Sequence, residues 1–270
     1  MTSPTIPVLI RVYNRIDDLV HNVQIIESRW NKGNWKIFIA FNGQGSGFKL
    51  PSEITAKHTI INIPENNGHK KGAWQLLKQG LQGIPDEYEY VVTLEADTWV
   101  LNDDVPLKYL DKMRADKDVV WCAANWVDKQ QSVAMDFAVV NCSFIRRRIE
   151  IVDIRNEVSL ECRIASDITK LGNKYLPISE CQPTHIPKAM PFRFQTWGRR
   201  RRIFPRTPML THHIEDLTGG MQTKESYALL LTGGTSSVKG IIFRTSLLLY
   251  EYLIHFIPKS RWFKGRRFKY

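Results

Sequence analysis

The sequence lacks any long hydrophobic run. No segment reaches about 18 uninterrupted apolar residues, so a helix that spans a membrane is not expected. The opening residues, MTSPTIPVLIRVYNR, contain no basic segment ahead of their short apolar run. A secretory signal peptide begins with such a segment, so secretion is not expected either.

Cysteine is scarce: the chain has Cys122, Cys142, Cys162 and Cys181 among 270 residues. None of them lies in a C-x-x-C pair or near a histidine at the spacing of a zinc site. In the absence of a secretion signal, we expect free thiols in the reducing cytosol.

Acidic residues are absent from two segments, 190–206 and 258–270, which each hold six lysines or arginines. Those twelve cations exceed the formal net charge of +11, and the rest of the chain is nearly neutral, with 26 basic and 27 acidic residues. The protein therefore has two local basic patches. Such patches suit a phosphate, a membrane surface or nucleic acid.

Internal repeats and low-complexity linkers are also missing. A composition of 43% hydrophobic and 24% charged residues is that of a packed globular protein. We therefore expect one domain over residues 1–220 and a C-terminal extension over 221–270.

Strands and helices alternate in the first half of the chain. Apolar runs and helical spacing predict, in order, a strand over 6–13, a helix over 16–30, strands over 35–41 and 58–63, a helix over 71–82 and a strand ending at Leu94. This order is typical of an α/β fold, with a mostly parallel sheet covered by helices on both faces.

The second half is less regular. Two strands are predicted over 117–126 and 136–145, and a helix over 160–171 with a stripe of Leu160, Ile164, Ile168 and Leu171. Residues 173–215 are proline-rich and are expected to cover the site as loops. An apolar helix is predicted over 241–257, before Pro258.

Two acids, Glu95 and Asp97, directly follow the fourth strand. Strands often end in surface charge, but here three other polar or glycine-rich loops also follow strands, and parallel sheets bind ligands at that edge. Residues two apart on an extended segment face the same side, so both carboxylates can reach one ion. Carboxylates suit Mg²⁺ or Mn²⁺, which complete their shells with substrate phosphates.

These stretches resemble a known family. IPVLIRVYNRIDDL (6–19), KIFIAFNGQGSG (36–47), NIPENNGHKKGAWQLL (62–77) and YEYVVTLEADTWV (88–100) are similar to the nucleotide-sugar half of GT-A glycosyltransferases, most like the inverting family 2 enzymes of bacteria. The resemblance implies a GT-A (Rossmann-like) fold, with residues 1–115 as the nucleotide-sugar half and 116–220 as the acceptor half. It also implies a hexosyltransferase-type activity in polysaccharide biosynthesis.

The resemblance assigns roles to the loops. Tyr13, Asn14 and Arg15 would line the base and ribose site, and Asn42 stands near a family position that contacts the base, with UDP as the implied nucleotide.

Residues at the ends of the third and fourth strands receive roles in the same way. Asn67 and Gly68, with Lys70 or Lys71, would border the ribose and diphosphate. Asp97 would coordinate the metal, and Glu95, in place of the first Asp of the DxD motif, would contact the ribose or a metal-bound water.

An inverting transferase needs a general base to take the proton of the acceptor hydroxyl. The family has an acid at the start of a helix, about eleven residues before a glycine. Glu161 stands eleven residues before Gly172 and Asp167 stands five before it. We favour Glu161, with Asp167 as the alternative, because a mid-helix acid more often forms a surface ion pair.

Late histidines and arginines are further candidates. The family often has a histidine at the metal or diphosphate, which would be His212 or His213, and less favourably His185. Arg199–Arg202 would help the diphosphate depart, or would form a solvated or membrane-facing patch.

The tail after residue 240 combines an apolar helix with basic and aromatic residues. Six cations interleaved with Trp262, Phe263, Phe268 and Tyr270 suit the anionic cytoplasmic leaflet. We expect peripheral contact with the membrane and a glycan or lipid-linked acceptor; packing on the core or in a homodimer is the alternative.

Two other functions compete with this hypothesis. A sugar-phosphate nucleotidyltransferase has a similar sheet, but it needs a glycine-rich loop after the first strand, where RVYNRIDD has no glycine. A non-enzymatic RNA-binding protein would use the basic patches. It leaves Glu95 and Asp97 without a role, and we expect no nucleic acid partner.

Overall fold

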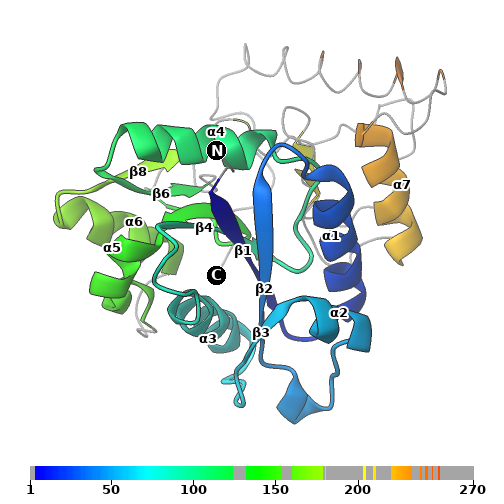
Figure 1. Ribbon diagram of the computed structural model, residues 1–270, viewed down its shortest axis with the longest axis horizontal. Coiled ribbons are helices and arrows are strands. Elements are labelled where there is room, and N and C mark those ends of the chain that lie inside the picture. The colour runs from blue at the N-terminus through cyan, green and yellow to red at the C-terminus, as the bar shows by residue number, and fades with distance from the viewer. Residues whose placement is uncertain are drawn as a thin grey trace, which may run out of the picture.

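The structure is a computed structural model (Figure 1). It describes residues 4–123, 132–153, 160–178, 180, 203–204, 209–210 and 220–232, together with the single residues 238, 241, 242, 245 and 249.

A seven-stranded sheet forms the centre of the molecule, in the order β3-β2-β1-β4-β7-β6-β8. Its strands are β1 (Thr5–Val12), β2 (Asn34–Phe41), β3 (Thr59–Asn62), β4 (Tyr90–Glu95), β6 (Val119–Ala123), β7 (Phe137–Asn141) and β8 (Lys174–Pro177). Only β7 runs antiparallel to its neighbours. The predicted α/β fold with a mostly parallel sheet is thus confirmed.

Helices cover both faces of this sheet (Figure 1). Helices α1 (Ile16–Arg29) and α4 (Asp104–Ala115) pack on one face, and their buried residues share a core with the inward side chains of β1, β2 and β4. Helices α3 (His69–Gln82), α5 (Cys142–Arg147) and α6 (Leu160–Lys170) bury their apolar side chains on the other face. Because both faces are covered, the central strands are apolar on both sides, as parallel strands require.

The helical stripes behave as their spacing predicts, with one difference. Leu160, Ile164 and Ile168 are buried in α6. Leu171 is not part of this stripe, because the helix ends at Lys170 and the Leu171 side chain is 42% exposed. Gly172 follows with a φ of +76°, the left-handed conformation that ends many helices.

Several elements differ from the expected ones. The strand predicted over 136–145 ends at Asn141, whose side chain accepts a hydrogen bond of 2.9 Å from the Phe144 amide and caps α5. Helices α2 (Ser52–Lys57) and α4 were not predicted. Part of the region expected as loops forms β8 and two short strands, β9 (Ile203–Phe204) and β10 (Met209–Leu210). Strand β10 lies between β9 and β5 (Trp99–Val100) and pairs antiparallel with both.

The expected domain boundary falls at the start of another helix, α7 (Gly220–Thr232). This helix lies beside α1 (Figure 1) and buries Lys224 there. In the predicted helix 241–257, the four described residues are helical and exposed: Ile241, Ile242, Thr245 and Leu249. The basic aromatic tail lies outside the described residues.

Cys122, Cys142 and Cys162 are reduced and are not part of a disulfide, and Cys181 lies outside the described residues. Burial raises the pKa of both Cys122 and Cys142 to about 12, so these two thiols stay protonated and unreactive at neutral pH. Within the described part of the chain, none of the helices has the length and apolar character needed to cross a bilayer.

Candidate functional site

A cleft of about 620 Å³ opens at the carboxyl ends of β1 and β4. Seven of the residues predicted for the site line it: Tyr13, Asn14, Arg15, Gly68, Glu95, Asp97 and Glu161. These residues come from four separate segments of the chain, and the parallel arrangement of β1 and β4 brings two of those segments together.

The acidic turn begins where β4 ends, at Glu95. The Thr98 amide donates to the Glu95 carbonyl at 2.9 Å, which closes a tight turn before β5 starts at Trp99. Asp97 is only 6% exposed, yet it lines the cleft together with Glu95. Both acidic residues of the turn therefore line the same cleft.

Arg11 lies under these acids, on the neighbouring strand. It is 3% exposed, pairs in register with Glu95, and places Nη2 3.6 Å from Glu95 Oε1. Its guanidinium also donates to the Met135 carbonyl. Burial lowers the pKa of Arg11, while Glu95, Asp136 and Asp97 oppose the shift. An arginine remains protonated in such surroundings, so the cleft contains a fixed cation beneath its acids.

The backbone of the acidic turn is held from behind by two side chains. Asn22 of α1 directs Nδ2 at the carbonyls of Glu95, Ala96 and Thr98, at 3.4, 3.3 and 2.9 Å. Lys224 of α7 donates to the Asp97 carbonyl at 2.6 Å. All four carbonyls from residue 95 to residue 98 therefore have a donor.

Lys224 forms a buried ion pair with Asp18, and both side chains are almost fully enclosed. Its ammonium also lies 4.1 Å from the centre of the Trp99 ring, whose indole N–H donates to the Asp18 carbonyl at 3.2 Å. Burial raises the pKa of Asp18 to about 6, although Lys224 opposes the shift, and burial lowers the pKa of Lys224. Both directions follow from the cost of removing charge from water.

The amino end of α3 forms another wall of the cleft. Gly68 precedes the helix with a φ of +87°, a left-handed conformation that suits glycine, and its amide donates to Asn66 Oδ1 at 3.0 Å. A Cβ at Gly72 would lie 2.1 Å from that same oxygen, so Gly72 lets Asn66 pack against the helix. Gly68, Gly72 and Ala73 line the cleft. The unpaired N–H groups of a helix start favour an anion such as a diphosphate.

The tip of β1 supplies Tyr13, Asn14 and Arg15 to the cleft. Tyr13 O–H donates to Ser46 Oγ at 3.1 Å, and its ring meets that of Phe48 edge-on at 5.3 Å. These contacts fix an aromatic wall at the cleft.

Glu161 reaches the cleft from the first turn of α6. Its carbonyl accepts a hydrogen bond of 3.1 Å from the Val133 amide, which ties the helix start to the segment ahead of β7. Asp167 does not line the cleft; its carboxylate lies 3.8 Å from Lys170. Of the two candidate bases, only Glu161 lines the cleft that contains the acidic turn.

The other predicted residues are placed differently. Asn42 is fully buried behind the cleft, where its Nδ2 donates to the Gly72 carbonyl at 3.2 Å. Asn67 and Lys71 are exposed and do not line the cleft. The remaining candidates lie outside the residues whose side chains are described: Lys70, His185, Arg199–Arg202, His212 and His213.

No three His, Cys, Asp or Glu side chains of the described ranges converge as a ready-made metal cage. Glu95 and Asp97 nevertheless offer hard oxygen ligands at one side of an open cleft. Mg²⁺ and Mn²⁺ sites built on one or two carboxylates take their other ligands from substrate phosphates and water, so the residues present fit such an ion.

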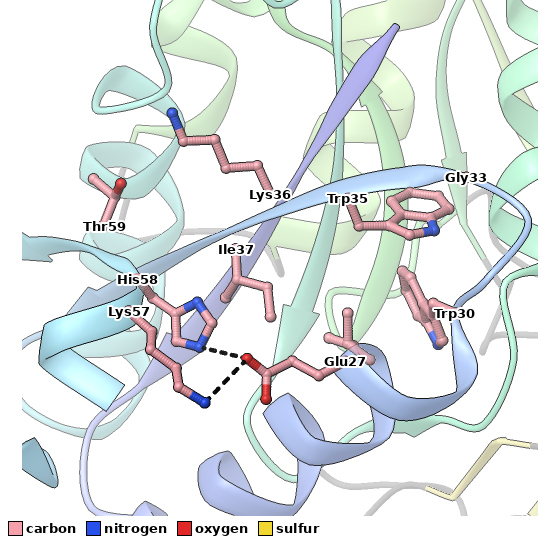
Figure 2. Close-up of a pocket in the computed structure, with 10 residues that line it drawn as sticks. Glu27, Trp30, Gly33, Trp35, Lys36, Ile37, Lys57, His58 and Thr59 are labelled. Atoms are coloured by element: carbon pink, nitrogen blue, oxygen red, sulfur yellow. Dashed lines mark ion pairs between the residues drawn. The ribbon is translucent and has the colours of Figure 1, made fainter. Parts of the chain in front are cut away.

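A second hollow, of about 360 Å³, lies at the amino end of β2 (Figure 2). Trp30, Trp35 and Ile37 line it, and Glu27 forms ion pairs there with His58 at 3.5 Å and Lys57 at 4.0 Å. None of the predicted site residues belongs to it.

Sequence reasoning missed Arg11, Asn22 and Lys224. Arg11 had a signal, because a lone cation inside the apolar run VLIRV must find a buried partner. Asn22 and Lys224 had no such signal, because their sequence positions do not differ from those of ordinary polar residues on an amphipathic helix.

Comparisons with known proteins give only distant matches. No protein-family model matches the chain, and neither does any curated protein. One solved structure that matches is the mannosyltransferase PcManGT from Pyrobaculum calidifontis, in complex with GDP-Man and Mn²⁺. The match covers 66% of this chain and 55% of the mannosyltransferase chain, with a TM-score of 0.49 and 12% sequence identity. The catalytic domain of Drosophila β1,4-galactosyltransferase 7, in complex with xylobiose, matches 65% of each chain, with a TM-score of 0.42 and 13% identity.

A third match is the 4-diphosphocytidyl-2C-methyl-D-erythritol synthase from Anaerococcus prevotii, over 64% of this chain and 87% of its own, with a TM-score of 0.39 and 8% identity. The chain thus spans between half and two thirds of the two glycosyltransferases.

The pairing of Arg11 with Glu95 can be measured by a double-mutant cycle. We expect Arg11→Met to lower the free energy of unfolding by about 2 kcal/mol, because Glu95 loses a buried counter-ion and the Met135 carbonyl loses a donor. In a Glu95→Gln background the same substitution should cost about 1 kcal/mol less. Urea denaturation measures both values, and an equal cost in the two backgrounds would show that the pair is not coupled.

Proposed function

We propose that this protein is a metal-dependent glycosyltransferase that moves a sugar from a nucleotide donor, UDP first among them, to a glycan or lipid-linked acceptor. The single observation that carries the proposal is the cleft. It unites the Glu95–Asp97 pair, the start of α3, the tip of β1 and Glu161. Each of these provides one chemical requirement of the transfer.

The donor's diphosphate and metal are assigned to the acidic turn. Asp97 would coordinate Mn²⁺ or Mg²⁺ with diphosphate oxygens, and Glu95, held by Arg11, would face the ribose or a metal-bound water. When bound, such an ion neutralises the charge that develops on the leaving diphosphate. The start of α3 adds backbone N–H groups, and Arg15 adds a cation at the same cleft.

The acceptor is assigned to the side of Glu161. As the acceptor hydroxyl attacks the anomeric carbon, its proton passes to the Glu161 carboxylate and a new C–O bond forms. The bond between the anomeric carbon and the diphosphate oxygen breaks, and the nucleoside diphosphate leaves with that electron pair. Attack from the face opposite the leaving group inverts the anomeric centre, which is the stereochemistry we propose.

We also propose that the enzyme associates with a membrane surface. The exposed Ile241, Ile242 and Leu249 sit just before the basic aromatic tail, and this combination suits the anionic cytoplasmic leaflet. A membrane-bound enzyme of this kind would meet a lipid-linked acceptor at the cytoplasmic face.

Donor binding provides the first test. With UDP and Mn²⁺ each near 100 times their dissociation constants, linkage adds about 2.7 kcal/mol of stability, so we expect the melting temperature to rise by about 5 °C. The rise should disappear with EDTA and in Asp97→Ala. It should persist in Asp111→Asn, an acid on α4 whose side chain is 73% exposed.

The same assay separates the competing functions. Stabilisation by RNA without any nucleotide effect would support a nucleic-acid-binding protein and contradict a transferase. A hydrolysis screen across nucleotide sugars, with Mn²⁺ and with Mg²⁺, then identifies the donor without knowledge of the acceptor.

The general base provides the second test. We expect Glu161→Gln to lower the transfer rate by about 100-fold or more, because the amide cannot accept the acceptor's proton. The affinity for UDP and Mn²⁺ should stay within about twofold. Asp167→Asn is the matched control on the same helix and should keep near wild-type transfer, because Asp167 lies outside the cleft. Equal losses in the two variants would contradict the role of Glu161.

A further inference from the structure

The carbonyl of Asp97 is the one backbone acceptor of the acidic turn that Asn22 does not meet. Asn22 donates to the carbonyls of Glu95, Ala96 and Thr98, and Lys224 donates to that of Asp97. These donors come from α1 and α7, and residues 97 and 224 lie 127 positions apart in the chain. The turn that presents the carboxylates is therefore set by a helix from the far end of the sequence.

The environment of Lys224 is built for its ammonium. The side chain is 1% exposed, and its partner Asp18 is fully buried. The ammonium has the Asp18 carboxylate, the Asp97 carbonyl and the face of Trp99 around it. Burying two charges is expensive, and an apolar pair of the same size would often be at least as stable. Stability alone is therefore a poor reason for a lysine at this position.

We propose that Lys224 is a positioning residue for Asp97. Asp18 fixes the ammonium, the ammonium fixes the Asp97 carbonyl, and the Asp97 carboxylate is thereby aimed into the cleft. The inference rests on the proposed function, because that function gives the carboxylate a metal to meet. Groups that orient a metal ligand typically change metal affinity by about 10-fold or more when they are removed.

The test uses the full-length chain and two variants. Asp18→Asn combined with Lys224→Met removes both charges, so neither is left buried without its counter-ion. Glu225→Gln is the matched control, because Glu225 is on the same helix and pairs at 2.9 Å with His21 of α1, in a partly exposed contact that involves neither Asp18 nor the Asp97 carbonyl. Cooperative unfolding of both variants is checked first.

The first readout needs no ligand. We expect amide hydrogen exchange over residues 95–99 to become about 10-fold faster in the double variant and to stay unchanged in Glu225→Gln. The second readout is the Mn²⁺ concentration that half-saturates UDP binding. It should rise about 10-fold in the double variant, and Glu225→Gln should keep the wild-type value.

The outcomes separate this inference from the proposed function. If the wild-type protein binds no nucleotide with Mn²⁺, the proposed function fails, and the exchange rates alone decide whether Lys224 holds the turn. If the wild-type protein binds but the double variant needs no more Mn²⁺, Lys224 is a structural contact and the inference is overturned. Unchanged exchange over residues 95–99 overturns it as well.

Discussion

The parallel pairing of β1 with β4 is the constraint on which the site depends. It sets Arg11 opposite Glu95 at the edge where both strands end. Because the register of a strand decides which face each side chain takes, a slip of one residue would turn Arg11 away from the acids and into the apolar core. The same pairing brings the tip of β1 next to the acidic turn, so that Arg15 and Asp97 line one cleft.

Around this pairing, the protein buries more charge than a structural core needs. Arg11, Asp18 and Lys224 are each at most 3% exposed, and all three lie within two contacts of the Glu95–Asp97 turn. Each buried charge has a partner, which is the condition under which such groups are tolerated. Three buried charges thus lie behind one short turn, whereas the ion pairs of Glu27 at the hollow near the amino end of β2 are partly exposed.

Most of the fold could be predicted from the sequence, because the spacing of the apolar residues matches the buried faces of the strands and helices. The run VVTLEAD gives both the buried strand β4 and the acids that follow it. Helix α4 also had a signal, since Val105, Tyr109 and Met113 recur at helical spacing. The strand predicted up to residue 145 was too long because Asn141, an efficient helix cap, looks in sequence like one more strand residue.

The residues of the candidate site also fall into a predictable and an unpredictable group. Groups that stand at strand or helix ends, such as Asp97 and Glu161, could be predicted because their chain position fixes their place in the fold. Groups that act through distant contacts could not: Lys224 and Asp18 are 206 residues apart, and nothing local to either residue indicates the other. Chain position alone was not enough for Asn42. It follows β2 as predicted, but its side-chain amide points inward and donates to the Gly72 carbonyl.

The most direct measurement of the central claim is an anomalous-scattering map from a crystal soaked with UDP and Mn²⁺. We predict one strong manganese peak within about 2.2–2.5 Å of an Asp97 carboxylate oxygen, with the diphosphate of UDP completing the shell. A crystal with UDP bound elsewhere, or with manganese bound away from Asp97, would contradict the assignment of this cleft as a nucleotide-sugar site.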